Sequence, residues 1–299
     1  MSCDRTAVLM TCYNRKTNTL ACLAALFNQV LPPEVTVDVY LVDDGSTDGT
    51  AEAVQQTYHQ VKILPGDGNL YWNRGMHKAF GEALKHDYDH YLWLNDDTLL
   101  DPEALNILLT TSDHLTQQGY QRAIVTGSIR DSQMNTLVYG GMVQASQWRP
   151  LKFYLIEPEA QAKQCDTING NCVLIPREVA QIVGNLDPAF THYLGDFDYG
   201  LRAQQQGCTV WIAPGYVGTC PLNRRQDSQI EASEQLPNLL KKMDRPKGLS
   251  IQEEVLYSFQ EWRHFAQRHS GVFWFFYCLL PYRRLLWSAV FGRFEGNKT

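Results

Sequence analysis

The first hundred residues alternate between short apolar runs and amphipathic stretches, and this alternation constrains the fold more than any other feature of the sequence. Four apolar, partly β-branched runs have the character of strands: Ala7–Thr11, Val35–Val42, Val61–Leu64 and Tyr91–Leu94. Three stretches place apolar residues at helical spacing: Thr17–Gln29, Asn73–His86 and a segment capped by Ser46 or Thr47 that runs to Tyr58. Repeated strand–helix units predict a mostly parallel sheet covered by helices, and therefore an α/β fold.

The remainder of the chain has three parts of different character. Residues 121–222 carry more strand-like runs, at Ala123–Ile129, Thr136–Val143, Cys172–Pro176 and Thr209–Ala213. Residues 223–250 are polar and basic, which predicts a loop or linker. Residues 251–299 contain an amphipathic stretch at Ile251–His269 and then a dense aromatic run, so we expect a C-terminal extension of amphipathic aromatic helices.

Charge and cysteine usage narrow the class of protein. A formal charge of −6 and a pI near 5.7 argue against a nucleic-acid-binding protein, which would need a basic face. Residues 240–299 nevertheless carry a net charge of +5. The eight cysteines form no CxxC pair and follow no secretory signal peptide, which predicts free thiols in a reducing cytoplasm. No run reaches the roughly 18 to 20 apolar residues that span a bilayer.

Acidic clusters follow two of the predicted strands. Asp43 and Asp44 come directly after the second strand, and Asn95, Asp96 and Asp97 follow the fourth. In an open α/β sheet, ligands bind beyond the carboxyl ends of the strands, where the strand order reverses. The chain has neither a GxGxxG sequence after its first strand nor a Walker A sequence, so nucleotide binding would depend on carboxylates.

Each cluster has a structural and a chemical interpretation. Asp43 or Asp44 could cap the following helix, or one of them could accept the imide N–H of a uracil or thymine ring. Asp96 and Asp97 repel each other, and a Mg²⁺ or Mn²⁺ ion that also binds diphosphate oxygens would compensate their charge. The alternative for this second pair is a solvated turn with a capping aspartate.

Two further segments carry candidate residues. Just before and within the helix predicted at Asn73–His86, Arg74 is placed to neutralise phosphate oxygens, while Trp72 could pack on a base or sugar or lie in the core. Asp196 opens another predicted helix, where it could act as a general base for an acceptor hydroxyl or simply cap the helix. Asp198 and Arg202 have the i,i+4 spacing of an ion pair on that helix.

The ordered set of these motifs resembles family 2 glycosyltransferases, inverting enzymes of the GT-A fold that use nucleotide sugars. The matching segments span roughly residues 5 to 220: Thr11–Arg15, Val42–Thr50, Asn73–Gly75, Leu94–Asp97 and Gly195–Ala203. The chain is most similar to bacterial rhamnosyl- and galactofuranosyl-transferase-like members. The resemblance implies a Rossmann-like mixed sheet flanked by helices, with a nucleotide-binding half over residues 1–120 and an acceptor half over 121–222.

The resemblance also implies roles for individual residues. Asp196 would be the catalytic base, with Asp198, Tyr199 and Arg202 in its supporting helix. Asp97 would be the metal ligand, with Asp96 either a second ligand or a contact of the ribose or sugar. Residues implied in binding the donor are Thr11, Tyr13, Asn14, Arg15, one of Asp43 and Asp44, Trp72, Arg74 and Asp96.

Two departures from the family pattern concern the metal. Asn95 stands where many relatives have the first carboxylate of the metal motif, and an amide is the weaker ligand. Many relatives complete the site with a histidine beyond the base helix, where this chain has Cys220. A thiolate is a poor ligand for Mg²⁺, so we expect Cys220 to be structural and the dependence on Mg²⁺ or Mn²⁺ to be weak.

The sequence therefore predicts an inverting glycosyltransferase that moves one sugar from a UDP- or dTDP-linked donor to a glycan or lipid-linked acceptor, in bacterial surface polysaccharide assembly. The leaving diphosphate would be held by the metal, Arg74 or Arg224–Arg225. Nucleotidyl transfer is a rival activity, but the basic signature that it needs near the first turn is absent. A catalytically silent nucleotide-sugar-binding or membrane scaffold protein is the other alternative.

The aromatic segment near the C-terminus, residues 271–291, predicts contact with a membrane surface. Aromatic residues on both sides of Arg283 and Arg284 suit the headgroup boundary of an anionic bilayer. The alternative is packing on the catalytic domain or on a dimer partner. We thus expect a cytoplasmic protein, peripheral on the inner face of the plasma membrane.

Overall fold

The computed structural model describes residues 4–220 and 251–279. The strands are β1 Asp4–Cys12, β2 Val35–Asp43, β3 Lys62–Pro65, β4 His90–Leu94, β5 Leu99–Leu100, β6 Ala123–Asp131, β7 Leu137–Tyr139, β8 Gly141–Ser146, β9 Arg149–Leu155, β10 Lys163–Cys165, β11 Thr167–Ile168, β12 Cys172–Pro176 and β13 Thr209–Cys220. The helices are α1 Lys16–Phe27, α2 Thr50–Thr57, α3 Tyr71–Ala83, α4 Ala104–Gln117, α5 Arg177–Val183, α6 Gly195–Gln205, α8 Ile251–His269, the 3₁₀ helix η1 Gly271–Phe273 and α9 Trp274–Leu279.

The chain forms two compact units, which we describe separately. The first comprises residues 1–143 and 155–222, and the second comprises 144–154 and 223–299. The linker predicted at 223–250 lies outside the described residues, as does the part of the predicted membrane segment beyond residue 279.

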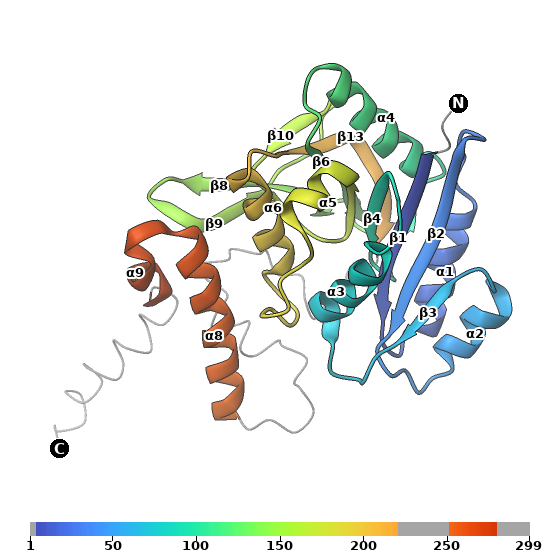
Figure 1. Cartoon of the computed structure of the whole chain (residues 1–299), viewed down its shortest axis with the longest axis horizontal. Coiled ribbons are helices and arrows are strands. Elements are labelled where there is room, and N and C mark those ends of the chain that lie inside the picture. The colour runs from blue at the N-terminus through green and yellow to red at the C-terminus, as the bar shows by residue number, and fades with distance from the viewer. Residues whose placement is uncertain (1–3, 221–250, 280–299) are drawn as a thin grey trace. The chain divides into compact units, whose positions relative to one another are not determined.

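A mixed sheet forms the centre of the first unit. Its strands follow the order β10-β13-β6-β12-β4-β1-β2-β3, with β5 and β7 paired at its side. Strands β4, β1, β2 and β3 are parallel, whereas β12 is antiparallel to both of its neighbours. The sheet is flanked by helices (Figure 1), which confirms the predicted mixed α/β fold.

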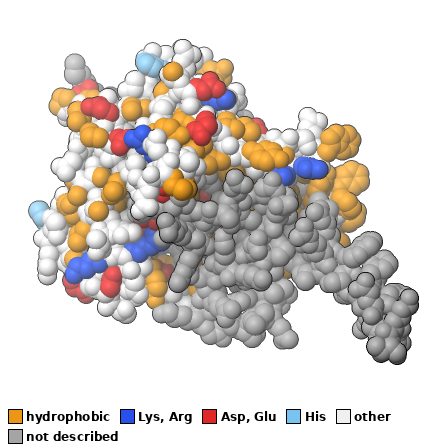
Figure 2. Space-filling model, turned by 180° about the vertical axis from the view of Figure 1, so that it is seen from behind, with side chains coloured by type: hydrophobic (Ala, Val, Ile, Leu, Met, Phe, Trp, Pro, Cys, Tyr) orange, Lys and Arg blue, Asp and Glu red, His pale blue; other side chains and the backbone are white. Residues whose placement is uncertain are grey.

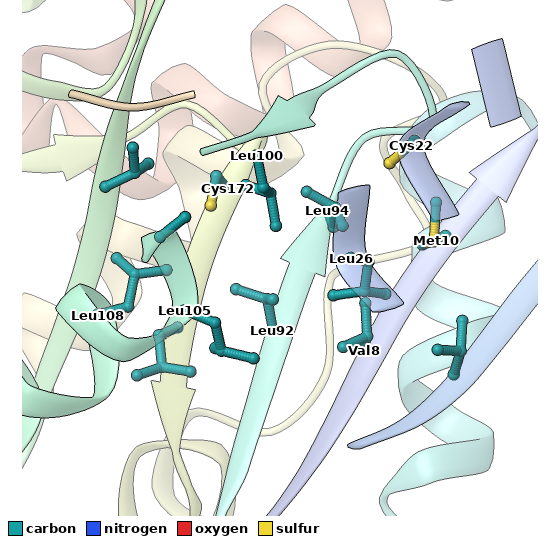
Figure 3. Close-up of a cluster of buried hydrophobic side chains, with 14 of the residues drawn as sticks. Val8, Met10, Cys22, Leu26, Leu92, Leu94, Leu100, Leu105, Leu108 and Cys172 are labelled. Atoms are coloured by element: carbon teal, nitrogen blue, oxygen red, sulfur yellow. The ribbon is translucent and has the colours of Figure 1, made fainter. Parts of the chain in front are cut away.

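Helices cover both faces of the sheet because its central strands are apolar on both sides. In β1, Val8 and Met10 belong to one buried cluster, and Ala7 and Leu9 to the other. The first cluster receives side chains from α1, α2 and α4, as the labelled residues of Figure 3 show in part. The second cluster receives them from α3, α5 and α6. At roughly 25 cal/mol per Å² of apolar surface removed from water, burial on both faces is the main stabilising contribution.

Local backbone geometry gives two elements other bounds than the sequence predicted. The second helix begins at Thr50 rather than at Ser46, because Gly49 has a φ of 79° and Asp48 Oδ1 accepts a hydrogen bond from Thr50 N at 3.0 Å. The strand predicted at Thr136–Val143 is two strands, β7 and β8, which lie in different sheets on either side of Gly140. Turn residues at these positions thus end regular structure sooner than the apolar pattern alone suggests.

The strand order reverses beside β1. The chain passes from β1 to β2 and β3 on one side, and β4 then pairs with β1 on the other side. The carboxyl ends of β1 and β4 are therefore neighbours, and the turns that follow them start at the same edge of the sheet. This is the position in an open α/β sheet where ligands bind.

The second unit is described through Gln144–Tyr154 and the helices α8, η1 and α9. Tyr277 Oη donates a hydrogen bond to the carbonyl of Trp148 at 3.2 Å, and Trp262 Nε1 donates to the carbonyl of Cys278 at 3.2 Å. Large apolar side chains here are exposed: Trp148, Tyr154, Val272, Phe273, Phe275, Phe276 and Leu279. Figure 2 shows hydrophobic side chains gathered on the surface at one edge of the view. Among the described helices, none is long and apolar enough to cross a membrane.

Candidate active site

The turns after β1 and β2 are joined by hydrogen bonds. Asn14 has a φ of 51°, in the left-handed region that asparagine tolerates better than most residues. Its side-chain Oδ1 accepts a hydrogen bond from Thr47 N at 2.7 Å, and its backbone N–H donates to Ser46 Oγ at 2.9 Å. Asp48 accepts a third bond, from Lys16 N, at 3.0 Å. These contacts fix the backbone on both sides of Arg15.

Asp43 and Asp44 have different surroundings. The Asp44 carboxylate accepts three backbone N–H bonds from the loop before α3, at 2.9 to 3.0 Å, from Gly68, Leu70 and Tyr71. Burial raises the pKa of Asp44 against the opposing effect of these bonds. Asp43 uses Oδ1 to accept a bond from Ser46 N at 3.0 Å, and its Oδ2 has no hydrogen-bond partner in the described part of the chain. Asp43 is therefore the member of the pair that keeps an acceptor for a ligand.

A single guanidinium group holds the second acidic pair. Arg15 Nη1 lies 3.1 Å from Asp96 Oδ1 and 2.6 Å from Asp97 Oδ2. Both aspartates are buried, whereas the Arg15 side chain is 36% exposed. Burial raises the pKa of Asp96 to about 7, although Arg15 opposes the shift. Burial alone would lower the pKa of Arg15, but the two carboxylates raise it above its ordinary value. Arg15 thus compensates part of the negative charge of the pair.

Asn95 has a defined partner. Its Oδ1 accepts a hydrogen bond from Trp72 Nε1 at 2.7 Å, and its backbone N–H donates to the carbonyl of Asn171 at 2.9 Å. Trp72 is partly buried, and its ring makes an edge contact with Trp93 in the core at a centroid distance of 6.1 Å. The amide in place of a carboxylate therefore fixes the orientation of the Trp72 ring.

Asp196 lies in the first turn of α6, after Leu194, whose φ is 69°. Its Oδ2 accepts a hydrogen bond from Gly170 N at 2.8 Å, and its Oδ1 accepts one from Phe197 N at 2.9 Å. Burial raises the pKa of Asp196 to about 6, and the two backbone bonds limit the shift. A carboxylate with a pKa near neutrality is suited to accept a proton from a substrate.

The predicted ion pair on α6 is present and has a structural role. Arg202 Nε donates to Asp198 Oδ2 at 2.8 Å. The same guanidinium also donates to the carbonyls of Val183 and Asn185, at 2.8 and 2.9 Å. Arg202 therefore ties α6 to the end of α5, and this contact supports the helix that carries Asp196.

The segment Asn169–Asn171 connects the clusters, and sequence reasoning missed it. Gly170 N–H binds Asp196, while the Asn171 carbonyl and side chain bind Asn95 N and Thr98 Oγ1. A Cβ at Gly170 would lie 2.3 Å from the Trp72 ring and 3.2 Å from Asp196 Cβ. Trp72, Asn95 and Asp196 are thus brought to one place, and only a glycine fits between them. The Asn-Gly-Asn sequence signals a tight turn but not its long-range partners.

Other predicted residues have structural contacts. Arg74 Nε donates to the carbonyl of Pro188 at 3.1 Å. The adjacent Asn73 is fully buried and donates to the carbonyls of Asp187 and Phe190, both at 2.8 Å, a positioning role that the sequence did not suggest. Cys220 is buried in the core at the end of β13. Across the described residues, no group of three or more His, Cys, Asp or Glu side chains could hold a metal ion.

Comparison with known proteins identifies the family. Residues 7–183 match the family described as Glycosyl transferase family 2. The chain belongs to this family. The sequence motifs predicted this family.

Two curated relatives indicate the range of activities in the family. This family member is 28% identical over 202 residues to the N-acetylglucosaminyl-diphospho-decaprenol L-rhamnosyltransferase of Mycobacterium tuberculosis, covering 61% of this chain and 65% of that protein. It is 23% identical over 220 residues to the poly-beta-1,6-N-acetyl-D-glucosamine synthase of Staphylococcus epidermidis, covering 70% of this chain and 50% of that protein. The match therefore leaves at least a third of each relative unaligned.

Solved structures share the fold. The crystal structure of GalNAc-T7 with UDP, GalNAc and Mn²⁺ superposes with a TM-score of 0.56 at 12% identity, covering 73% of this chain and 44% of that one. The structure of S. aureus TarS gives a TM-score of 0.55 at 11% identity, covering 90% and 44%. The likeness confirms the predicted GT-A-type architecture of this chain.

Proposed function

We propose that the enzyme transfers one sugar from a UDP- or dTDP-linked donor by direct displacement, with inversion at the anomeric carbon and Asp196 as the general base. One observation carries the proposal. Gly170 N–H holds Asp196 while the next residue, Asn171, holds Asn95 beside the acidic pair. A base for the acceptor and the groups suited to the leaving diphosphate therefore lie around a single three-residue segment.

In the reaction, the acceptor hydroxyl oxygen forms a bond to the anomeric carbon as the bond from that carbon to the diphosphate oxygen breaks. Asp196 takes the hydroxyl proton, and the nucleoside diphosphate leaves with the electron pair. Since the pKa of Asp196 is about 6, the carboxylate is ionised at neutral pH and still basic enough to share the proton. Its two backbone bonds hold the side chain in place, so little reorganisation precedes transfer.

For the donor, we assign the base to the turn that follows β2. Asp43 Oδ2 is an acceptor suited to the imide N–H of uracil or thymine, and the half-exposed Tyr13 can pack on the ring. Thr11 lies in β1 opposite Val42 of β2, and Asn14 joins the turns that follow these two strands. Asp44, whose oxygens are taken up by backbone amides, maintains the loop that leads to Trp72 and Arg74.

The residues fit a divalent cation. Asp97 and Asp96 offer hard carboxylate oxygens, and Mg²⁺ or Mn²⁺ commonly completes its coordination with water and substrate phosphates. Bound there, the ion would offset negative charge on the leaving diphosphate. Cys220, inside the core and a soft ligand, is not assigned to it.

We further propose a lipid-linked acceptor in surface polysaccharide assembly. The name of the mycobacterial relative specifies a decaprenol diphosphate acceptor, which resides in a membrane. The exposed aromatic side chains of η1 and α9 suit the headgroup boundary, where aromatic residues concentrate. Both points favour an enzyme that works at the inner face of the plasma membrane.

The catalytic assignment is tested with Asp196→Asn. Removing the base leaves the shape of the site but no proton acceptor, so transfer should fall by about 10² to 10⁴-fold. Donor binding, measured by calorimetry with the nucleotide sugar that a thermal-shift screen selects, should stay within twofold. Asp113→Asn, an exposed aspartate on α4, is the control and keeps full activity. An Asp196→Asn enzyme with near-normal turnover would refute the assignment.

The membrane assignment is tested by flotation of the full chain with vesicles of phosphatidylglycerol and phosphatidylethanolamine. Replacing Phe275 and Phe276 by serine removes two aromatic side chains that are 55% and 57% exposed, and should reduce the bound fraction severalfold. Met134→Ser, at a 65% exposed position in the first unit, should leave binding unchanged. Equal flotation of all three proteins would contradict membrane contact through α9.

A further inference from the structure

We infer that Arg15 is a built-in counter-ion for the acidic pair, and that a divalent cation binds Asp96 and Asp97 only by displacing it. The inference rests on the proposed function, because it concerns the metal that would assist that reaction. It adds a competition between two cations, one of them part of the chain, for the same carboxylates.

Arg15 contacts both members of the acidic pair. One nitrogen, Nη1, contacts an oxygen of each aspartate, at 3.1 and 2.6 Å. Asp96 and Asp97 are also the residues that would hold a divalent cation. The guanidinium and such an ion would therefore compete for the same two carboxylates.

The charge of Asp96 and Asp97 favours a cation beside them. Asp96 and Asp97 are 5% and 8% exposed, and two adjacent buried carboxylates are unstable without compensation. Arg15 compensates part of their charge. A divalent ion that entered beside an unmoved Arg15 would meet a like charge at close range, so its binding favours release of the arginine.

The Arg15 side chain can leave the two carboxylates while the backbone of Arg15 stays in place. Asn14 and Lys16 are hydrogen-bonded to the turn after β2, which fixes the backbone around Arg15. The Arg15 side chain is 36% exposed, so it already reaches solvent and its guanidinium can move outward or toward an anionic diphosphate. Release would thus free the positive charge of Arg15 to pair with the diphosphate.

The competition is severe because the acidic pair offers a cation few protein ligands. In the residues that the structure describes, no third His, Cys, Asp or Glu joins Asp96 and Asp97 in a metal-binding group. With two carboxylates as protein ligands, a cation gains little from the protein beyond what it must take from Arg15. Weak binding of metal in the absence of donor follows.

The test measures Mn²⁺ binding to the full chain by calorimetry, with no donor, acceptor or turnover. In Arg15→Gln, Mn²⁺ should bind at least tenfold more tightly than in the wild-type protein, a gain of about 1.4 kcal/mol. Arg5→Gln is the matched control, because Arg5 pairs with Asp38 at 3.7 Å and lies at the opposite end of β1. Affinity in this control should stay within twofold.

A double variant locates the effect. Adding Asp97→Asn to Arg15→Gln should abolish the gain, since it removes a ligand of the same site. The inference is overturned if Arg15→Gln binds Mn²⁺ no more tightly than wild type, if Arg5→Gln shows the same gain, or if the gain persists in the double variant. None of these outcomes depends on transfer, so the assignment of Asp196 is judged separately.

A second measurement covers the case in which Arg15→Gln does not fold. In the wild-type protein, the Nε–Hε resonance of Arg15, assigned by its absence from Arg15→Lys, is followed by NMR during a Mg²⁺ titration. Displacement predicts that it shifts toward the position of a solvent-exposed arginine as the metal saturates. A resonance that stays in place while Mg²⁺ binds overturns the inference.

Discussion

Two turns of this molecule carry the same Asp-Asp sequence at the carboxyl end of a buried parallel strand, yet their carboxylates are satisfied in different ways. After β2, the Asp44 carboxylate is held by three backbone amides. After β4, Asp96 and Asp97 are held by one long, partly exposed side chain, Arg15. The sequence motif is shared, but the partners are not.

The difference distinguishes a carboxylate that maintains the backbone from carboxylates that can bind a ligand. Backbone amides cannot leave Asp44 unless the loop that contains Gly68 and Tyr71 unfolds, so this carboxylate is committed to structure. A guanidinium can leave Asp97 by rotating its own side chain, so that carboxylate can exchange partners. An aspartate at a strand end is thus a ligand candidate only when its present partner is dispensable.

Among substitutions in the two Asp-Asp turns, Asp97→Asn should have the largest effect on catalysis. If Asp97 holds charge opposite the leaving diphosphate, its loss should lower kcat by about 10² to 10³-fold, the range typical of electrostatic groups. Stability should change by less than about 1 kcal/mol, because Arg15 still pairs with Asp96. Transfer assays and urea unfolding measure the two effects. If Asp97→Asn unfolds easily but remains active, Asp97 has a structural role, and its comparison with Asp44 is reversed.

Asp44→Ala should show the opposite pattern. Three backbone donors lose their acceptor, and the free energy of unfolding should fall by about 2 to 4 kcal/mol.

Asp43→Ala removes the acceptor of a single backbone N–H. It should lower the free energy of unfolding by about 1 kcal/mol and also weaken binding of the donor. Urea denaturation with nucleotide titration compares them. Equal stability losses would show that the two aspartates are not differentiated as the hydrogen bonds imply.

The pH dependence of transfer tests a third acidic turn, in which the proposed base Asp196 is held by two amides. Burial raises its pKa to about 6, so below that pH the side chain is protonated and cannot accept a proton. We expect kcat/KM to fall about tenfold per pH unit below pH 6 and to level off above pH 7. A fall in kcat/KM centred near pH 4 would show that the base is an aspartate of ordinary pKa, and would weaken the case for Asp196.

Cys220→Ala should have the smallest effect. Its thiol lies in the core, so removal should cost about 1 kcal/mol of stability and leave Mn²⁺ affinity unchanged. Calorimetry and thermal unfolding check both. A loss of metal affinity would add a third ligand to the acidic pair, and would make the second turn more of a preformed metal site than its geometry indicates.

Local patterns were sufficient for the longer strands of the central sheet and for α1, α2 and α3, but not for β5, β9, β10 and β11. β1, β2 and β4 lie where apolar, β-branched runs predicted them, because buried parallel strands are apolar on both faces. The positions of Asp43, Asp97 and Asp196 at strand or helix ends were likewise predictable. Hydrogen bonds between Asp198 and Arg202 follow from helical spacing alone.

Partners distant in the sequence were not predictable. Nothing near Asp44 indicates that its acceptors serve amides 24 to 27 residues away, and Arg15 meets Asp96 and Asp97 across 81 and 82 residues. The role of Asn169–Asn171 also depends on three elements that meet only in the folded chain. Spacing reveals neighbours on one element, whereas these contacts depend on how the strands are ordered in the sheet.

Gly170 has a practical consequence for engineering. The absence of any side chain there lets an indole ring and the proposed base lie against the same backbone atom, and even a methyl group would separate them. Directed evolution toward new acceptors would therefore gain little from randomising this codon. Diversity is better introduced at positions that face the incoming alcohol without touching the support of the carboxylate.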